Sequence, residues 1–433
     1  MNKTRDSFFC TGRNSGQGCR SLTLFRLLLA VILFATAANG QSYDLLLKNG
    51  QLIDPKNNIN GKMDIAIHDG KVAKVAASIP AGQAKKTIDI SGLYVAPGFI
   101  DIHTHVFVGG KPETFADGFL SVSPDDFTLK SGVTTVVDAG TSGWRNFPVF
   151  KEHVIDKSRT RVLAFLNIAG NGMTGSPTEQ DVNDMDAYMT SLVVKKNPDI
   201  IVGVKIGHYE GNDWAPFDRA LDAAAKSNTV LFVECHLPQF SLEDQLKKMR
   251  PGDIITHSFE KIEERMPVTD EQGKLRPFVI DAQKRGVLFD LGHGGAGFWF
   301  SVAVPAMKQG LAPNSFGSDL HRFSMNAGMK DMMNIMSKYM AMGMPLPEVV
   351  ERATWNAAKA IHRNDLGSLS EGNVADIAVF RVREGNFGYT DAGGNVINGT
   401  KKLEAELTIR NGKVVWDLNG ISGTPLQQAS SSK

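Results

Sequence analysis

The chain carries the sequence VAPGFIDIHTH at residues 95–105. The apolar run from Tyr94 to Ile102 is typical of a buried strand, and it ends at two histidines separated by one residue. Side chains at positions i and i+2 of a strand point the same way, so His103 and His105 can direct both imidazoles at one point. That point lies at the carboxyl end of the strand. Paired imidazoles there suit a divalent metal ion such as zinc.

The middle of the chain repeats this unit. Eight strand-like segments alternate with polar–apolar segments of helical period, such as residues 213–226 and 277–285. The segments span residues 95–102, 133–138, 161–168, 200–206, 230–235, 253–256, 287–291 and 315–318. Eight such units predict an α/β fold, a (β/α)8 TIM barrel over residues 95–365. Functional residues of that fold lie where the strands end.

The two ends of the chain have a different pattern. Short apolar runs broken by Asn-Gly and Asp-Gly pairs fill residues 41–94 and 366–420. Such pairs are typical of hairpin turns between strands. We therefore predict one small β-sandwich domain formed by both chain ends, followed by a flexible tail over residues 421–433.

Residues 1–40 resemble a targeting segment. Five basic side chains precede the apolar stretch 27–35, which is too short to span a bilayer with ease. Small residues then end at Gly40, where a signal peptidase would cut. The pattern predicts a signal peptide cleaved after Gly40 and an exported protein, periplasmic or secreted. A retained membrane anchor is the alternative interpretation.

The composition sets limits on partners. The 433 residues carry a net charge of +1, with 42% hydrophobic and 21% charged residues, as in ordinary soluble proteins. This balance gives no reason to expect a nucleic acid or, after removal of the leader, a membrane. We expect a small-molecule substrate, and a homo-oligomer is compatible with the sequence. The mature chain would keep only Cys235, so it would contain no internal disulfide.

Four further residues that can bind a metal follow other predicted strands. Lys205 lies near the end of the fourth strand, His236 follows the fifth, His257 the sixth and Asp319 the eighth. With His103 and His105 they make six side chains that a barrel would bring to one mouth. Chance placement of one is easy, but chance placement of all six is not.

These residues carry a resemblance to a known family. Residues 97–105 and 366–377 resemble the opening motif of the amidohydrolase superfamily and its return to the sandwich domain. Residues 132–140 and 316–321 look like the dihydroorotase-related branch, nearest a deacetylase-like subgroup. The resemblance covers the mature chain from about Tyr43 to Trp416.

The resemblance implies a metal-dependent hydrolase with two zinc ions bridged by an N6-carboxylated Lys205. It would place His103, His105 and Asp319 on one ion, and His236 and His257 on the other. A protonated lysine is a poor ligand and a costly buried charge, whereas its carboxylated form is an anionic two-oxygen bridge. Two zinc ions would hold a shared hydroxide near neutral pH, and Asp319 would act catalytically by accepting its proton.

The leading interpretation is a binuclear zinc hydrolase that cleaves an amide or ester bond of a small acylated carboxylate, such as an N-acyl amino acid. A cyclic amidase similar to dihydroorotase or hydantoinase, or a base deaminase, is the alternative. A third interpretation is an inactive metal-binding scaffold, which the presence of all six candidate ligands disfavours.

Residues that would contact the substrate are less clearly marked. His208 or Tyr209, just beyond Lys205, can donate a hydrogen bond to a developing oxyanion. His293 lies in a glycine-rich loop after the seventh strand. Arg145 and Arg322, after the second and eighth strands, are placed to bind a substrate carboxylate. Each of these also has an ordinary structural interpretation.

Overall fold

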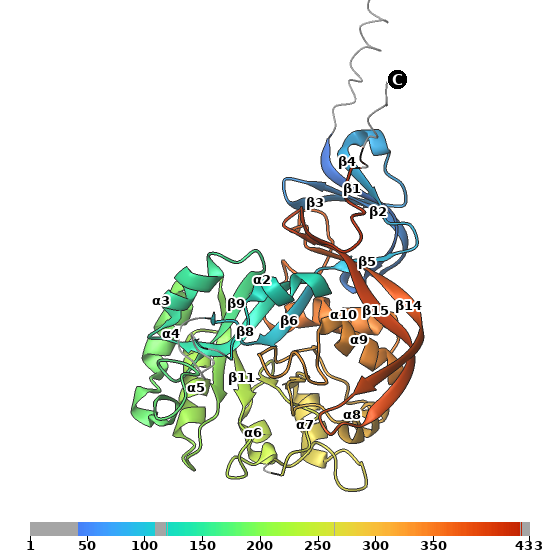
Figure 1. Ribbon diagram of the computed structural model, residues 1–433. Helices are drawn as coiled ribbons and strands as arrows, with labels where there is room; N and C mark the ends of the chain where they lie inside the picture. Colours follow the sequence, from blue (N-terminus) through green and yellow to red (C-terminus); the bar gives the residue numbers. More distant parts are fainter. Residues whose placement is uncertain (1–41, 109–117, 119, 264, 425, 427–433) are drawn as a thin grey trace, which may run out of the picture.

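The computed structural model describes residues 42–108, 118, 120–263, 265–424 and 426. The predicted signal peptide over residues 1–40 lies outside this part of the chain. The described residues form a parallel sheet surrounded by helices and, above it in Figure 1, a mixed sheet built from both chain ends. Among the described helices, none has the length and apolar character needed to cross a membrane.

The parallel sheet has seven strands in the order β13-β12-β11-β10-β9-β8-β6. Neighbouring strands pair in parallel register throughout. The strands are β6 (Phe99–Thr104), β8 (Val133–Gly143), β9 (Arg161–Asn167), β10 (Ile201–Gly207), β11 (Val230–Glu234), β12 (Ile254–Ile255) and β13 (Leu288–Phe289). Seven of the eight predicted segments therefore form strands of one parallel sheet.

The eighth predicted segment, residues 315–318, forms no regular strand. It makes a single parallel bridge from Ser315 to Asp290, and Leu320 makes another to Thr104 of β6. Residues 315–320 thus touch both edges of the seven-stranded sheet. The fold is an α/β half-barrel of parallel strands, and full closure into eight strands stays a prediction.

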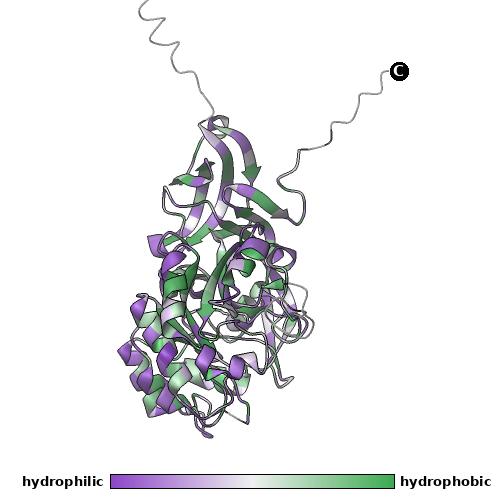
Figure 2. Ribbon diagram, turned by 90° about the vertical axis from the view of Figure 1, so that its left-hand side faces the viewer, coloured by the Kyte–Doolittle hydropathy of each residue, from purple (hydrophilic) through white to green (hydrophobic). Residues whose placement is uncertain are grey.

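Helices connect and surround the strands, as the alternating pattern predicts. The structure has α2 (Pro124–Phe127), α3 (Phe147–Phe150), α4 (Ala187–Lys196), α5 (Ala215–Lys226), α6 (Leu242–Lys248), α7 (Pro277–Arg285), α8 (Phe300–Lys308), α9 (Met332–Ala341), α10 (Leu346–Ala353) and α11 (Trp355–Ala360). Figure 2 shows apolar residues along the central strands and many polar residues on the outer helices. This distribution buries the sheet between layers, as parallel sheets require.

The mixed sheet joins the two chain ends. Its order is β16-β15-β14-β5-β1-β2-β3, and β4 also pairs with β1. The strands are β1 (Tyr43–Asp54), β2 (Ile59–His68), β3 (Lys71–Ala76), β4 (Ala84–Asp89), β5 (Tyr94–Pro97), β14 (Ile377–Thr390), β15 (Val396–Arg410) and β16 (Lys413–Asp417). Both ends contribute, as predicted, but their strands form one hydrogen-bonded sheet instead of the two separate sheets of a sandwich.

The prediction of one strand over residues 94–102 is wrong, because Gly98 divides this run. Residues before Gly98 form β5, which pairs with β14 in the mixed sheet, and residues after it form β6 of the parallel sheet. A β carbon at Gly98 would lie 2.2 Å from Thr134 Oγ1 of β8. Only glycine lets the chain pass this close to β8 as it crosses from one sheet to the other.

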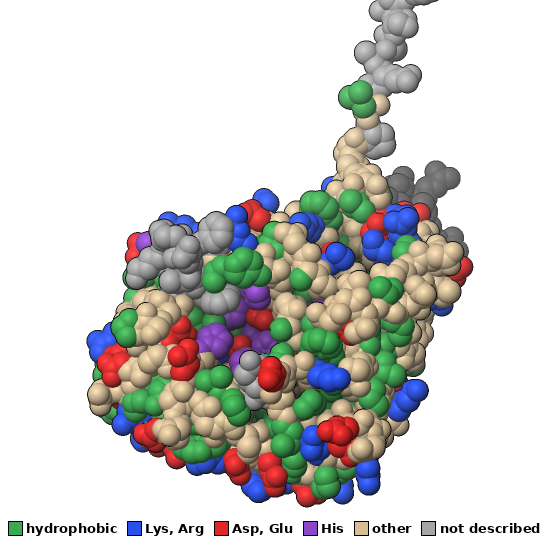
Figure 3. Space-filling model, turned by 60° about the horizontal axis from the view of Figure 1, so that its bottom comes forward, with side chains coloured by type: hydrophobic (Ala, Val, Ile, Leu, Met, Phe, Trp, Pro, Cys, Tyr) green, Lys and Arg blue, Asp and Glu red, His purple; other side chains and the backbone are tan. Residues whose placement is uncertain are grey.

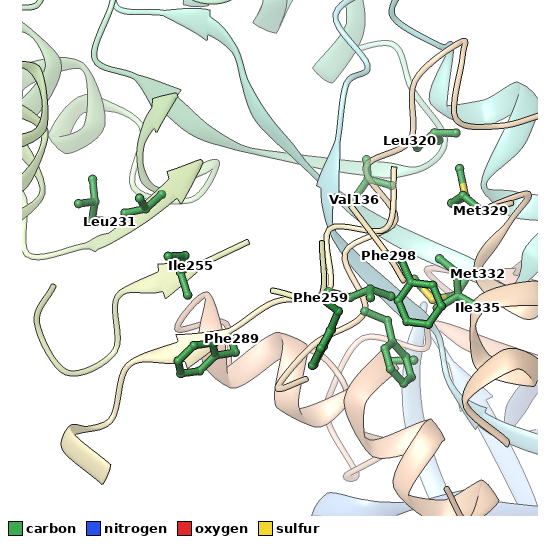
Figure 4. Packing of buried hydrophobic residues seen from close by; sticks show 14 of the residues in the cluster. Val136, Leu231, Ile255, Phe259, Phe289, Phe298, Leu320, Met329, Met332 and Ile335 are labelled. Carbon is green, nitrogen blue, oxygen red and sulfur yellow. The ribbon is translucent and has the colours of Figure 1, made fainter. Parts of the chain in front are cut away.

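Aromatic, aliphatic and methionine side chains fill the space between the parallel sheet and the C-terminal helices. Figure 4 shows Phe259, Phe298, Met332 and Ile335 gathered there, and all four are buried. The long β14–β15 hairpin runs alongside this region in Figure 1, where Leu403 N of β15 donates a 2.8 Å hydrogen bond to Ser337 Oγ of α9. This hydrogen bond connects the mixed sheet to helix α9.

The crossing at Gly98 can be tested by adding one methyl group. We expect Gly98→Ala to lower the free energy of unfolding by about 1–3 kcal/mol, because the new carbon overlaps Thr134. Thermal unfolding measures the effect. Gly61→Ala in β2 is the matched control, since a β carbon there meets no atom within 4 Å. Equal melting temperatures for both variants would contradict this account of the crossing.

Candidate metal centre

Three of the predicted ligands, His103, His105 and Asp319, lie close together. The two histidines come from the end of β6, and Asp319 comes from the segment 315–320. His103 Nε2 lies 3.4 Å from Asp319 Oδ1, and His105 Nε2 lies 3.2 Å from the same oxygen. All three side chains are buried. Their ligand atoms lie within 4.8 Å of one another, so one ion can contact all three. Figure 3 shows histidine and acidic side chains on the floor of a hollow in this face.

A second group surrounds Glu234, the last residue of β11. Glu234 Oε1 lies 3.0 Å from His257 Nε2, 3.2 Å from His236 Nε2 and 3.3 Å from His208 Nε2. The other oxygen, Oε2, lies 3.6 Å from His103 Nε2. The Glu234 carboxylate therefore stands between the first group and the second.

Lys205 enters the centre from β10. Its side chain is 1% exposed, its amine donates a 2.9 Å hydrogen bond to the carbonyl of Ala139, and it forms an ion pair with Glu234. Gly140 makes room for it, because a β carbon there would lie 2.5 Å from Lys205 Cγ. The lysine thus points inward to the space shared by both groups, as the sequence predicts.

The His103 ring is fixed by a chain of hydrogen bonds behind it. Thr256 Oγ1 donates to Asp290 Oδ2 at 2.9 Å, and Asp290 is buried with further donors from Ser315 and Gly317. The one proton of the threonine hydroxyl is therefore used. His103 Nδ1, 2.9 Å from Thr256 Oγ1, must be the donor to it. This arrangement leaves the Nε2 lone pair directed into the centre.

The rings of the second group are oriented in the same way. His257 Nδ1 donates to the carbonyl of Gly292 at 2.7 Å, since a carbonyl can only accept. His236 Nδ1 lies 3.3 Å from Glu260 Oε2, and Glu260 is held by a buried ion pair with Arg265 at 2.6 Å. Both rings consequently present Nε2 to Glu234. Acceptors that hold Nδ1–H in this manner are typical of metal-binding histidines.

The donors present fit a metal pair. His103 Nε2 is buried and has no hydrogen-bond partner. The Nε2 atoms of His257 and His236 face a carboxylate, so each needs either a proton or a cation there. Imidazole nitrogen and carboxylate oxygen are the ligands that zinc takes in catalytic sites.

The charges of the centre shift the pKa values of its side chains. Burial opposes the charged form of Asp319, but the neighbouring His103 and His321 rings outweigh burial and hold its pKa well below the usual range. Burial likewise disfavours charged His257, yet the Glu234 carboxylate raises the pKa of this ring to about 9. Burial also opposes the charged form of Glu234, but Lys205 and His257 beside it hold the pKa of this carboxyl well below its usual range. The Asp319 and Glu234 carboxylates are therefore ionised and attract positive charge into the centre.

Two of these side chains sit on strained backbone. His257 has φ of 53° and Asp319 has φ of 51°, in the left-handed region that residues other than glycine seldom occupy. Such conformations persist where the surrounding contacts fix them, and they are concentrated at functional sites.

The predicted substrate residues occupy varied positions. His208 lies in the centre, with Nδ1 3.4 Å from Glu179 Oε1 and Nε2 facing Glu234. Tyr209 is half-buried, and its ring packs against Phe240 at 6.1 Å. Their predicted contacts with a developing oxyanion stay predictions.

The other three are less favourably placed. The guanidinium of Arg145 is paired with Asp184 and stacks on Trp144 at 3.9 Å, so its charge is already neutralised. Arg322 is exposed beside His321. His293 is fully buried, and its nitrogens face Gly294 O and Lys338 Nζ. The structure therefore gives no support to a substrate contact by His293.

Sequence reasoning missed Glu234, although a signal for it exists. Residues 234 and 236 are two apart, so the alternation that directs His236 inward directs Glu234 the same way. His321 was also missed as a site residue, and its Nε2 lies 3.7 Å from Asp319 Oδ2. Glu260 and Thr256 are invisible to this reasoning, because their partners lie on other strands.

Comparisons with known proteins agree with this geometry. A deacetylase from Agrobacterium fabrum is 33% identical over 76% of this chain and 80% of its own length, and one from Enterococcus faecalis is 31% identical over 86% and 99%. The model of the amidohydrolase family matches residues 302–415. The chain belongs to the amidohydrolase family. It is a hydrolase of the amidohydrolase superfamily.

Two solved structures with similar folds belong to enzymes with other names. A crystal structure of an adenine deaminase has a TM-score of 0.80 and 30% identity, covering 87% of this chain and all of its own. A crystal structure of a dihydroorotase has a TM-score of 0.77 and 30% identity, covering 86% and 99%. Proteins named deacetylase, adenine deaminase and dihydroorotase are thus all similar to this chain over most of its length.

Removing the acceptor behind His103 tests the ring orientation. We expect Thr256→Val to weaken zinc binding about 10- to 100-fold, because Nδ1 loses the group that fixes its proton and the ring direction. Competition with a chromogenic chelator measures the affinity. Thr134→Val is the control, since this buried hydroxyl has no hydrogen-bond partner. Unchanged affinity in Thr256→Val would show that the ring needs no such support.

Proposed function

We propose that this amidohydrolase is a binuclear zinc enzyme that cleaves an amide or ester bond of a small acylated carboxylate, in the manner of a deacetylase or an N-acyl amino acid hydrolase. The observation that carries the proposal is the shared position of Glu234 and Lys205 between two sets of inward-facing imidazoles. One set with one carboxylate would serve a single ion, whereas two adjacent sets suit a pair.

In this proposal His103, His105 and Asp319 would hold one zinc ion, and His236 and His257 would hold the other. Lys205, carboxylated at Nζ, would supply the anion between them. An unmodified ammonium would place a positive charge beside two zinc ions in a buried space, where repulsion is strong. Carboxylation removes that charge and supplies an anion. Glu234, the present partner of the amine, is a further candidate ligand beside the bridge.

The bound metal pair would supply an activated water at neutral pH and polarise the carbonyl group that is attacked. The chain's own part is to place groups around that reaction. The Asp319 carboxylate would accept the proton of the attacking water and pass it to the leaving group. His208, held between Glu179 and Glu234, lies where it can donate to a developing oxyanion.

A hollow next to the centre offers room for a substrate. Its volume is about 730 Å³. Leu237, the residue after His236, is one of the residues that line it. Phe240 and Met266 give it apolar walls, and basic and acidic side chains, such as Lys261 and Glu263, both line it. Apolar walls suit an acyl group. Export by way of residues 1–40 is also part of this proposal.

A cyclic amidase is the second candidate. The similarity to a dihydroorotase structure over 86% of this chain favours it. The deacetylase relatives, which match this chain at similar identity, favour the first candidate. The two candidates share the metal centre and differ in whether the bond that is cleaved lies in a ring.

Replacing the lysine tests the bridge. We expect Lys205→Ala to retain less than half of the zinc of the unmodified protein and to lose at least about 100-fold in kcat, because the connecting anion is gone. Plasma emission spectrometry gives the metal content. Native mass spectrometry of the protein without the substitution should show a mass increase of one CO2. Exposed Lys308→Ala is the control. Two zinc ions per chain in Lys205→Ala would rule out the bridging role.

A substrate panel tests the reaction. Purified zinc-loaded protein is incubated with N-acyl amino acids, acyl esters of hydroxy acids and cyclic imides. We expect turnover of open-chain acylated carboxylates and its loss in Asp319→Asn, which keeps the size of the side chain but accepts no proton. Turnover of cyclic imides alone would establish the second candidate instead. Zinc binding with no turnover of any class would contradict both candidates.

A further inference from the structure

A lysine outside the centre is buried without a carboxylate in hydrogen-bonding distance. Lys338 of α9 is 0% exposed. Its Nζ lies 2.6 Å from His293 Nε2, donates to the carbonyl of Gly328 at 2.9 Å and stands 5.2 Å from the ring centre of Phe298. A buried ammonium is costly, so a neutral hydrocarbon would pack there at lower cost. A contribution to stability therefore does not explain why a lysine is buried at position 338.

The donor and acceptor roles in this pair are determined by the neighbours. His293 Nδ1 is 3.0 Å from the carbonyl of Gly294, which can only accept, so Nδ1 carries the proton. Nε2 therefore accepts from Lys338. The ring also stacks on Phe298 with centres 4.9 Å apart. The Gly294 carbonyl and Lys338 thus together fix the tautomer and the direction of His293.

His293 belongs to the loop 292–297, which touches one ligand of each metal set. A β carbon at Gly294 would lie 2.2 Å from Asp319 Oδ2, so this loop forms the wall behind that carboxylate. A β carbon at Gly297 would lie 2.3 Å from His257 Nδ1, and Gly292 O accepts from the same atom. Small movements of the loop would therefore displace both ligands.

The segment 298–300, whose Phe298 ring lies near Lys338, is connected to the mixed sheet. Asp391, at the tip of the β14–β15 hairpin, accepts a hydrogen bond from Phe300 N at 3.0 Å, and Ala392 N donates to Phe298 O at 2.9 Å. Phe298 is the ring beneath both His293 and Lys338. The hairpin, α9 and the loop 292–297 consequently form one packed unit.

We propose that Lys338 is a positioning residue that, through His293, holds the loop 292–297 against Asp319 and His257 so that both keep their ligand geometry. The proposal rests on the proposed metal centre. It makes the mixed sheet a support for the site, because the hairpin of that sheet packs on the same unit. No contact between Lys338 and substrate is required.

The variant Lys338→Met removes the amine and keeps the length of an apolar side chain. We expect zinc affinity to fall about 10- to 100-fold, as for other residues that orient ligands indirectly, and the visible spectrum of the cobalt-substituted protein to change. The melting temperature of the metal-free variant should equal or exceed that of the unmodified protein, because a desolvated charge is lost. Exposed Lys308→Met serves as the control.

A double variant adds a second test. His293→Phe keeps the stacking on Phe298 and removes both nitrogens. If Lys338 acts through His293, the loss of zinc affinity in Lys338→Met with His293→Phe should be clearly smaller than the combined losses of the two single variants. Fully additive losses would overturn the proposal.

Two further outcomes would also overturn it. One is an unchanged affinity and cobalt spectrum in Lys338→Met. The other is a loss of affinity that occurs only together with a lower melting temperature of the metal-free variant, which would make Lys338 merely structural. If the unmodified protein bound no divalent metal, the proposed function itself would fail, and that result is distinguishable from both.

Discussion

Imidazole nitrogens and two ionised carboxylates converge in a buried space, and this arrangement needs positive charge between them. His103 and His105 share the Asp319 carboxylate, while His236 and His257 share Glu234. Acceptors outside the cluster hold Nδ1 of His103 and His257, which sends each Nε2 inward. The strand ends, the strained backbone and the glycine contacts all serve to maintain this one convergence.

Much of this arrangement follows from periodicity. The i and i+2 rule places His103 beside His105 at the end of β6, and the alternation of strands and helices places Lys205 and His257 at the same edge. The rule also indicates Glu234 through its spacing from His236. What fails is the apolar run 94–102, because composition alone does not show that Gly98 sends the chain from one sheet into the other.

Contacts between distant segments lie beyond sequence reasoning. Lys338 and His293 are 45 positions apart, and nothing in the helical pattern of residues 332–341 indicates that one lysine is buried. The support of His103 by Thr256 joins residues 153 positions apart. Such pairs depend on the packing of whole elements. The candidate ligands are thus readable from the sequence, whereas the groups that orient them become visible only in the fold.

The most direct measurement is anomalous X-ray diffraction at the zinc absorption edge from crystals of zinc-loaded protein. The account predicts two neighbouring peaks, one among His103, His105 and Asp319 and the other beside His236 and His257, with Lys205 directed between them. A single peak, or peaks away from these imidazoles, would contradict the paired centre.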